Sequence, residues 1–163
     1  MISHNDNPWL RWAAGLTMLA ALAHFLIIAG GPDWYRFFGA GEAIARLAAQ
    51  GHWYPPVLTT VLALVLTTWA FYAWSGAGMM RRLPGIGVAL AMVSLIFFAR
   101  ALFGFWLVHA PAVADAHLLE LQQRPLFLWG SSLYCLALAA CYSLGLVKLK
   151  RCMQRTRWNQ LSG

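Results

Sequence analysis

Long apolar runs alternate with short polar stretches along the chain, and this alternation predicts its architecture. Four runs approach the length of about 20 apolar residues that a helix needs to cross a bilayer core of roughly 30 Å. Because lipid cannot hydrogen-bond a bare backbone, each run is expected to form an α-helix. The predicted membrane-spanning helices cover about residues 12–29, 57–74, 86–108 and 126–147.

Proline and glycine lie at the ends of these runs, where they start or stop a helix. Gly30-Gly31-Pro32 follows the first run, Pro55-Pro56 precedes the second, and Pro125 precedes the fourth. The first run has an alternative as a signal peptide, because Ala21-Leu22-Ala23 resembles a cleavage site. The apolar run continues past Ala23, so we expect a retained helix.

The composition supports a membrane protein over a water-soluble one. Hydrophobic residues make up 61% of the 163 residues and charged residues 10%, whereas soluble domains carry about 25% charged residues. A chain of this length fits one domain, residues 1–163. The sequence therefore predicts an all-α integral membrane four-helix bundle in contact with the lipid bilayer.

Positive charge is concentrated in two regions, and their positions predict the orientation. Arg81 and Arg82 lie between the second and third runs, and a basic tail, residues 148–163, follows the fourth. Helix parity places both regions on one side, which the positive-inside rule assigns to the cytoplasm. We expect a bacterial inner membrane, both termini in the cytoplasm, and a tail that contacts anionic lipid headgroups. The basic residues on the cytoplasmic side explain the net charge of +7, so no nucleic-acid partner is expected.

The segment from about residue 32 to residue 50, on the opposite side, is too aromatic and apolar for a plain loop. After Gly39-Ala40-Gly41, residues 42–49 have the pattern of a short helix that Gly51 ends. Glu42 and Arg46 are spaced i,i+4 and can pair on one face of that helix. We expect the whole segment to form an amphipathic lid in the membrane interface.

Arg100 is the most informative polar residue, because a charge within an apolar run usually faces the bundle or a watery cavity. It lies about 12 Å below the outer end of the third helix, given a rise of about 1.5 Å per residue. Its long side chain can reach back towards the outer interface. The other three helices carry polar residues at a similar level: His24, Thr59, Thr60, Ser131 and Ser132.

Two interpretations of this polar level stay open. In one, the polar groups hydrogen-bond between helices and only hold the bundle together. In the other, they line a polar cavity roofed by the lid, with Asp33, Arg36 and Glu42 at its mouth. That cavity would be cationic because Arg100 stays protonated. It would suit the carboxylate, phosphate or carbonyl group of an amphiphile, with His24 able to supply or accept a proton.

No cofactor and no metal are expected. Cys135, Cys141 and Cys152 show neither metal-ligand nor redox spacing. Haem ligation would need two facing histidines, but His24 and His109 differ in depth by roughly 8 Å. The sequence contains no phosphate-binding loop, nucleophile elbow or paired catalytic carboxylates.

Two motifs resemble those of a known family. One is GPDWYRFFGAGE, from Gly31 to Glu42, and the other is YAWSGAG, from Tyr72 to Gly78, which Leu83-Pro84 follow. Together with the arginine in the third helix, they resemble a family of small, uncharacterised four-helix bacterial inner-membrane proteins. The resemblance covers roughly residues 15–147 and implies the four-helix topology. It implies no activity and no catalytic residue.

Three hypotheses for the function follow. The leading one is a non-enzymatic membrane protein that binds or passes a small amphiphilic or anionic ligand at a polar site in the outer leaflet. The second is a membrane isomerase, hydrolase or redox protein acting on a lipid-like substrate, with His24 and Glu42 as its proton-transfer pair. The third is a homo-oligomer or an accessory subunit of a membrane complex, packed through small residues such as Gly104.

Overall fold

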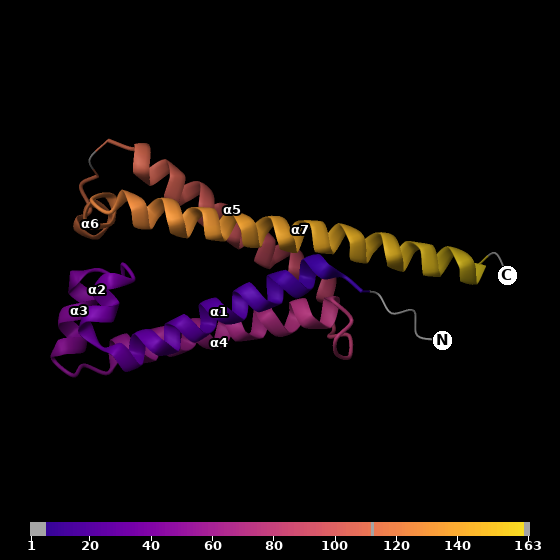
Figure 1. Ribbon diagram of the computed structural model, residues 1–163, viewed down its shortest axis with the longest axis horizontal. Helices are drawn as coiled ribbons and strands as arrows, with labels where there is room; N and C mark the ends of the chain where they lie inside the picture. Colours follow the sequence, from indigo (N-terminus) through magenta and orange to yellow (C-terminus); the bar gives the residue numbers. More distant parts are fainter. Residues whose placement is uncertain (1–5, 112, 162–163) are drawn as a thin grey trace.

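The computed structural model describes residues 6–111 and 113–161, and their regular secondary structure is entirely helical (Figure 1). Four of the helices are long and apolar enough to cross a membrane. They are α1 (Pro8–Gly30), α4 (Tyr54–Gly76), α5 (Ile86–His109) and α7 (Pro125–Leu161). The all-α fold class with four potential membrane-spanning helices, predicted from the sequence, is confirmed.

Short helices connect the long ones and close two helical hairpins. α2 (Pro32–Phe37) and α3 (Glu42–Ala49) join α1 to α4, and α6 (Ala116–Gln122) joins α5 to α7. α1 packs along α4, and α5 packs along α7. Figure 1 shows the two hairpins diverging towards the end that carries α2, α3 and α6. We call this end the lid end and the opposite end, where the chain begins, the tail end.

The fourth long helix is longer than predicted. α7 does not stop near Val147 but continues through the basic tail to Leu161. The tail contains no proline or glycine before residue 163, and its lysine, arginine and glutamine residues favour a helix. Figure 1 shows this part of α7 extending beyond the other helices at the tail end.

The short helix α6 was not predicted from the sequence. Its N-terminus is capped by Asp115, whose carboxylate accepts a hydrogen bond from the backbone N–H of Leu118 at 3.0 Å. Such a cap satisfies a donor that would otherwise have no partner at the start of the helix. An aspartate three residues before Leu118, at the start of the apolar pair Leu118-Leu119, was the available signal.

The two hairpins are joined in the middle of the bundle by hydrogen bonds from tyrosines of α7. Tyr142 is fully buried, and its hydroxyl lies 3.1 Å from Thr17 Oγ of α1 and donates to the carbonyl of Trp69 in α4 at 3.2 Å. Tyr134 donates to the carbonyl of Leu16 in α1 at 2.6 Å. In lipid the hydrophobic effect between helices is weak, so hydrogen bonds and close packing hold such contacts together.

Most of the surface of the long helices is apolar and exposed. Only 22% to 39% of each candidate membrane span is buried inside the protein. A water-soluble protein rarely exposes such large apolar areas, whereas lipid tails cover them at no cost. Exposed tryptophans lie towards both ends, Trp12 at the tail end and Trp53 and Trp106 at the lid end, as expected for side chains at the two membrane interfaces.

The predicted short helix of the lid is present as α3, and we keep the name lid for residues 32–50. Ile44 and Ala48 of α3 pack against a small cluster that contains Ile27 of α1 and Tyr35 of α2. The helix ends before Gly51, which has a positive φ of 69°, as predicted. The lid is therefore a packed layer over the end of the first hairpin.

Candidate functional site

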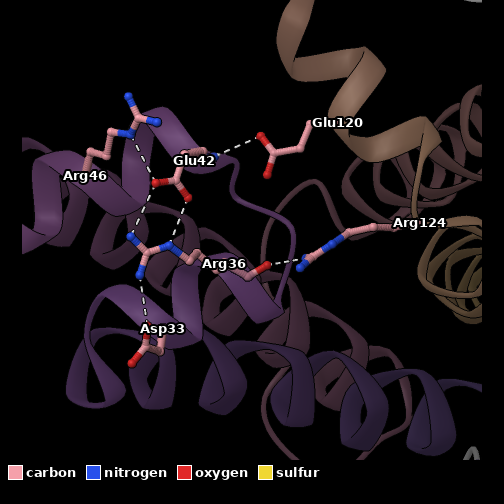
Figure 2. Close-up of polar contacts among 6 residues, drawn as sticks. All are labelled: Asp33, Arg36, Glu42, Arg46, Glu120 and Arg124. Carbon is pink, nitrogen blue, oxygen red and sulfur yellow. Dashed lines mark hydrogen bonds and ion pairs between the residues drawn. The ribbon is translucent and has the colours of Figure 1, made fainter.

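The charged residues of the lid form a connected network, which Figure 2 shows. Arg36 of α2 lies at its centre. Its guanidinium donates two hydrogen bonds to Glu42, at 2.8 and 3.3 Å, and one to Asp33 at 2.9 Å. Arg46 donates to the same Glu42 carboxylate at 3.0 Å. The predicted Glu42–Arg46 pair is confirmed, but Glu42 has a second partner, Arg36, that was not predicted.

The network determines the charge state of Glu42. The hydrogen bonds from Arg36, and then the one from Arg46, lower the pKa of Glu42 from its ordinary value of 4.5 to about 2. The hydrogen bond to Glu42, and then the one to Asp33, raise the pKa of Arg36. Glu42 is thus a stable carboxylate and a weak base, already occupied by two cations.

Two charged residues of the second hairpin connect it to the lid. The carboxylate of Glu120 in α6 accepts a hydrogen bond from the backbone N–H of Glu42 at 2.9 Å. Arg124, just before α7, donates to the carbonyl of Arg36. Figure 2 shows both contacts reaching the lid from the same side. The divergent hairpins are therefore bridged at the lid end by polar contacts to the backbone.

The backbone of the lid also approaches the second hairpin closely. Gly41 has a φ of 90°, which side chains disfavour, and a Cβ at this position would collide with the imidazole of His117. At Gly39 a Cβ would lie 2.7 Å from the ring of Phe127. Glycine is required at both positions because the lid lies directly against α6 and the start of α7.

Arg100 lies on α5 beside the interface with α7. A Cβ on Gly104, one turn closer to the lid end, would lie 3.0 Å from Nη1 of Arg100 and would collide with Oγ of Ser132 in α7. The guanidinium therefore extends towards the lid end, as expected. Ser132 is fully buried. Neither Nη1 of Arg100 nor Oγ of Ser132 has a hydrogen-bond partner among the described residues.

One edge of the Arg100 guanidinium is enclosed and the other is not. Nη1 is fully buried beside Gly104, whereas Nε and Nη2 are not among the enclosed atoms. These two nitrogens also make no hydrogen bond within the described part of the chain. On the helix surface, residues three and four positions away are neighbours, here Ile96 and Phe103, which are exposed. Exposed apolar side chains therefore flank Arg100 on the surface of α5.

No carboxylate of the protein neutralises Arg100 in the part of the chain that the structure describes. Asp33 and Glu42 pair with Arg36, and Glu120 binds the backbone of the lid. The apolar stretches of the four long helices, residues 12–29, 54–76, 86–109 and 125–147, contain no Asp or Glu and no other Lys or Arg. Arg100 is therefore an unpaired cation at membrane depth.

The other predicted site residues form hydrogen bonds within their own helices. Nδ1 of His24 lies 2.7 Å from the carbonyl of Ala20. The hydroxyl groups of Thr60 and Ser131 donate to the carbonyls of Pro56 and Leu128. Thr59 likewise donates to Pro55. The predicted residues thus separate into two groups: Arg100 with Ser132 in the bundle, and Asp33, Arg36 and Glu42 in the lid.

Sequence reasoning missed three residues of these groups. Gly104 was noted only as a small packing residue, although a glycine in a helix costs about 1 kcal/mol relative to alanine. A close neighbour that excludes a Cβ, here Ser132, explains its presence. Glu120 and Arg124 lie in the polar stretch between the third and fourth apolar runs, and nothing in their spacing indicates that they contact the lid.

The described residues contain no cluster of three or more His, Cys, Asp or Glu side chains that could hold a metal ion. Comparison with family models, with curated proteins and with solved structures finds no match to this chain. The resemblance carried by the two sequence motifs therefore stays a prediction.

Proposed function

We propose that this chain is a small, non-enzymatic membrane protein that binds or passes an amphiphile whose anionic or hydrogen-bond-accepting head contacts Arg100. The observation that supports this is the unpaired guanidinium beside Gly104 and Ser132. A charged side chain at the centre of a membrane helix costs about 2.5–3.5 kcal/mol on insertion scales. An anion from outside the chain would offset this cost.

The alternative interpretation of Arg100 as a brace between helices has less support. A bracing arginine donates to backbone carbonyls, and Arg100 makes no such hydrogen bond among the described residues. Extension of its side chain towards the lid end reduces the cost of the charge but does not neutralise it. A ligand head accounts for both the depth of the charge and its free edge.

The enzymatic hypothesis gains no support from the geometry. It needs His24 and Glu42 to transfer a proton between them, yet no hydrogen bond joins these two residues in the described part of the chain. Glu42 is held as a carboxylate of low pKa by Arg36 and Arg46. A role as a homo-oligomer or as a subunit of a larger complex stays a prediction.

We further propose that the protein lies in a bacterial inner membrane, with the lid end outside and the tail end in the cytoplasm. Its support is the excess of lysine and arginine at the tail end, in residues 77–85 and 148–163. Single cysteines at Gln50 and Met79, in a chain without its native cysteines, test this. A membrane-impermeant maleimide should label Gln50→Cys in intact spheroplasts and Met79→Cys only after lysis. The reverse pattern would overturn the orientation.

Native mass spectrometry of protein extracted from membranes tests the binding itself. We expect the wild type to retain small anionic amphiphiles and Arg100→Gln to lose them. Arg11→Gln is the matched control, because Arg11 is a helix arginine that pairs with Asp6 at the tail end. Equal retention by the wild type and Arg100→Gln would contradict the proposed site.

A further inference from the structure

We infer that the amphiphile at Arg100 is a single-chain carboxylate, a fatty-acid-like molecule whose carboxylate pairs with the Nε–Nη2 edge of the guanidinium. This inference rests on the function proposed above and narrows it to one class of ligand. Three features of the site support it: its charge, the shape of its free edge and the chemistry of its surroundings.

The charge of the site calls for a single negative charge. Arg100 is the only Lys, Arg, Asp or Glu in the apolar stretches of the four long helices. A monoanion leaves a neutral pair, whereas a dianion such as a phosphate monoester would bring an excess negative charge to membrane depth. Unpaired charge at that depth is costly, so the head carries one charge.

The free edge of the guanidinium fits a carboxylate. Nη1 is fully buried beside Gly104, which leaves the edge formed by Nε and Nη2. These nitrogens present two parallel N–H donors, and the two oxygens of a carboxylate accept both at once. A single carbonyl or hydroxyl oxygen would satisfy only one of them and would leave the charge in place.

The surroundings of that edge favour a small head on an alkyl chain. Ile96 and Phe103 flank Arg100 on α5 and are 41% and 43% exposed, so an alkyl chain can lie against them. Of the predicted polar level only Ser132 lies beside Arg100, and the hydroxyl groups of Thr60 and Ser131 donate within their own helices. The glycerol and ester groups of a phospholipid would find few polar partners here, and a buried polar group without a partner costs free energy.

Equilibrium dialysis in dodecyl maltoside micelles tests the inference with three radiolabelled probes: dodecanoate, its methyl ester and phosphatidylglycerol. The proteins compared are the wild type, Arg100→Gln, Arg100→Lys and Arg11→Gln. All four are measured at one micelle concentration, so that the partition of each probe into micelles is the same in every sample. Removing this unpaired charge should not impair folding, and circular dichroism of each variant checks this.

The wild type and Arg11→Gln should bind dodecanoate about tenfold or more tightly than Arg100→Gln, given the strength of hydrogen bonds to charged groups. Arg100→Lys should recover little of this difference, because lysine lacks the paired donors. The methyl ester should bind all four proteins equally.

The dialysis experiment distinguishes a wrong ligand class from a wrong proposed function. Binding of phosphatidylglycerol or of the methyl ester that depends on Arg100, without such binding of dodecanoate, would overturn the carboxylate and leave the proposed function standing. If the binding of every probe and every extracted lipid is independent of Arg100, the inferred carboxylate ligand and the proposed function are both wrong.

Discussion

Arg100 of α5 and Ser132 of α7 meet across Gly104, so that Nη1 and Oγ both lie within 3.0 Å of the position that a Cβ on this glycine would occupy. This relationship aligns the guanidinium along the interface of the second hairpin. It also means that the smallest change to α5, a single methyl group, must displace one or both polar side chains.

Gly104→Ala should therefore impair ligand retention without altering the charge of the site. We expect a several-fold loss of bound amphiphile in native mass spectra, because the guanidinium and Ser132 cannot both keep their places. Gly130→Ala is the control, since nothing lies within 4 Å of a Cβ on Gly130 of α7. That variant should retain ligand fully, with stability unchanged or raised by up to about 1 kcal/mol from helix propensity. Equal retention by both variants would contradict the role of Gly104.

The charge network of the lid should depend on acid pH. Bonds from Arg36 and Arg46 lower the pKa of Glu42 from 4.5 to about 2, so the folded lid binds the proton less readily than the unfolded lid. The resulting stabilisation is fully present above pH 4.5 and is lost as the pH falls from 4.5 towards about 2. Thermal melts across this range should show a fall in stability for the wild type and a smaller fall for Glu42→Gln. Identical profiles would count against the network.

Removal of the Glu120 carboxylate should loosen the contact between the lid and the second hairpin. Glu120→Ala deletes the acceptor of the Glu42 N–H, and such a bond contributes about 0.5–1.5 kcal/mol. Hydrogen exchange of the Glu42 amide should accelerate by about 2- to 10-fold. Glu120→Gln keeps an acceptor oxygen and should change the exchange much less. Unchanged exchange in Glu120→Ala would show that this bond does not hold the lid.

Tyr142 should contribute measurably to the joining of the hairpins. Tyr142→Phe keeps the ring but removes the contacts with Thr17 and the carbonyl of Trp69. Hydrogen bonds between membrane helices contribute about 0.6 kcal/mol on average and up to about 1.7 kcal/mol, so a loss of that size is expected in reversible unfolding. Tyr72→Phe should be nearly neutral, because the Tyr72 hydroxyl makes no hydrogen bond in the described part of the chain. An equal loss in both variants would argue against a specific contact.

The elements that could be predicted from the sequence are those encoded locally. The four long helices follow from apolar runs between prolines and glycines, and α3 follows from Glu42, Arg46 and Gly51 over a few turns of chain. The Glu42–Arg46 pair was predictable because i,i+4 residues are neighbours on any helix. The length of α7 was underestimated because a membrane span ends where the chain becomes polar, while the helix itself does not.

The contacts that were missed depend on how separate elements meet. Arg36 reaches Glu42 only because the chain turns back at Gly39 and Gly41, and Glu120 lies 78 residues from Glu42. The similar depth of His24, Thr60, Ser131 and Arg100 was inferred from helix rise, but depth does not give the direction of a side chain. His24, Thr60 and Ser131 bond within their own helices, and only Ser132 of the polar level lies beside Arg100.

The most direct test of the central claim is the ¹⁵N–¹H spectrum of the arginine side chains in lipid nanodiscs, titrated with dodecanoate. The Arg100 resonance is assigned by its absence in Arg100→Lys, and Arg36, already bound to Glu42, is the internal control. We predict a saturable shift of the Arg100 Nε–H signal while the Arg36 signal stays in place. An unmoved Arg100 signal, or equal shifts for both arginines, would contradict a carboxylate site at Arg100.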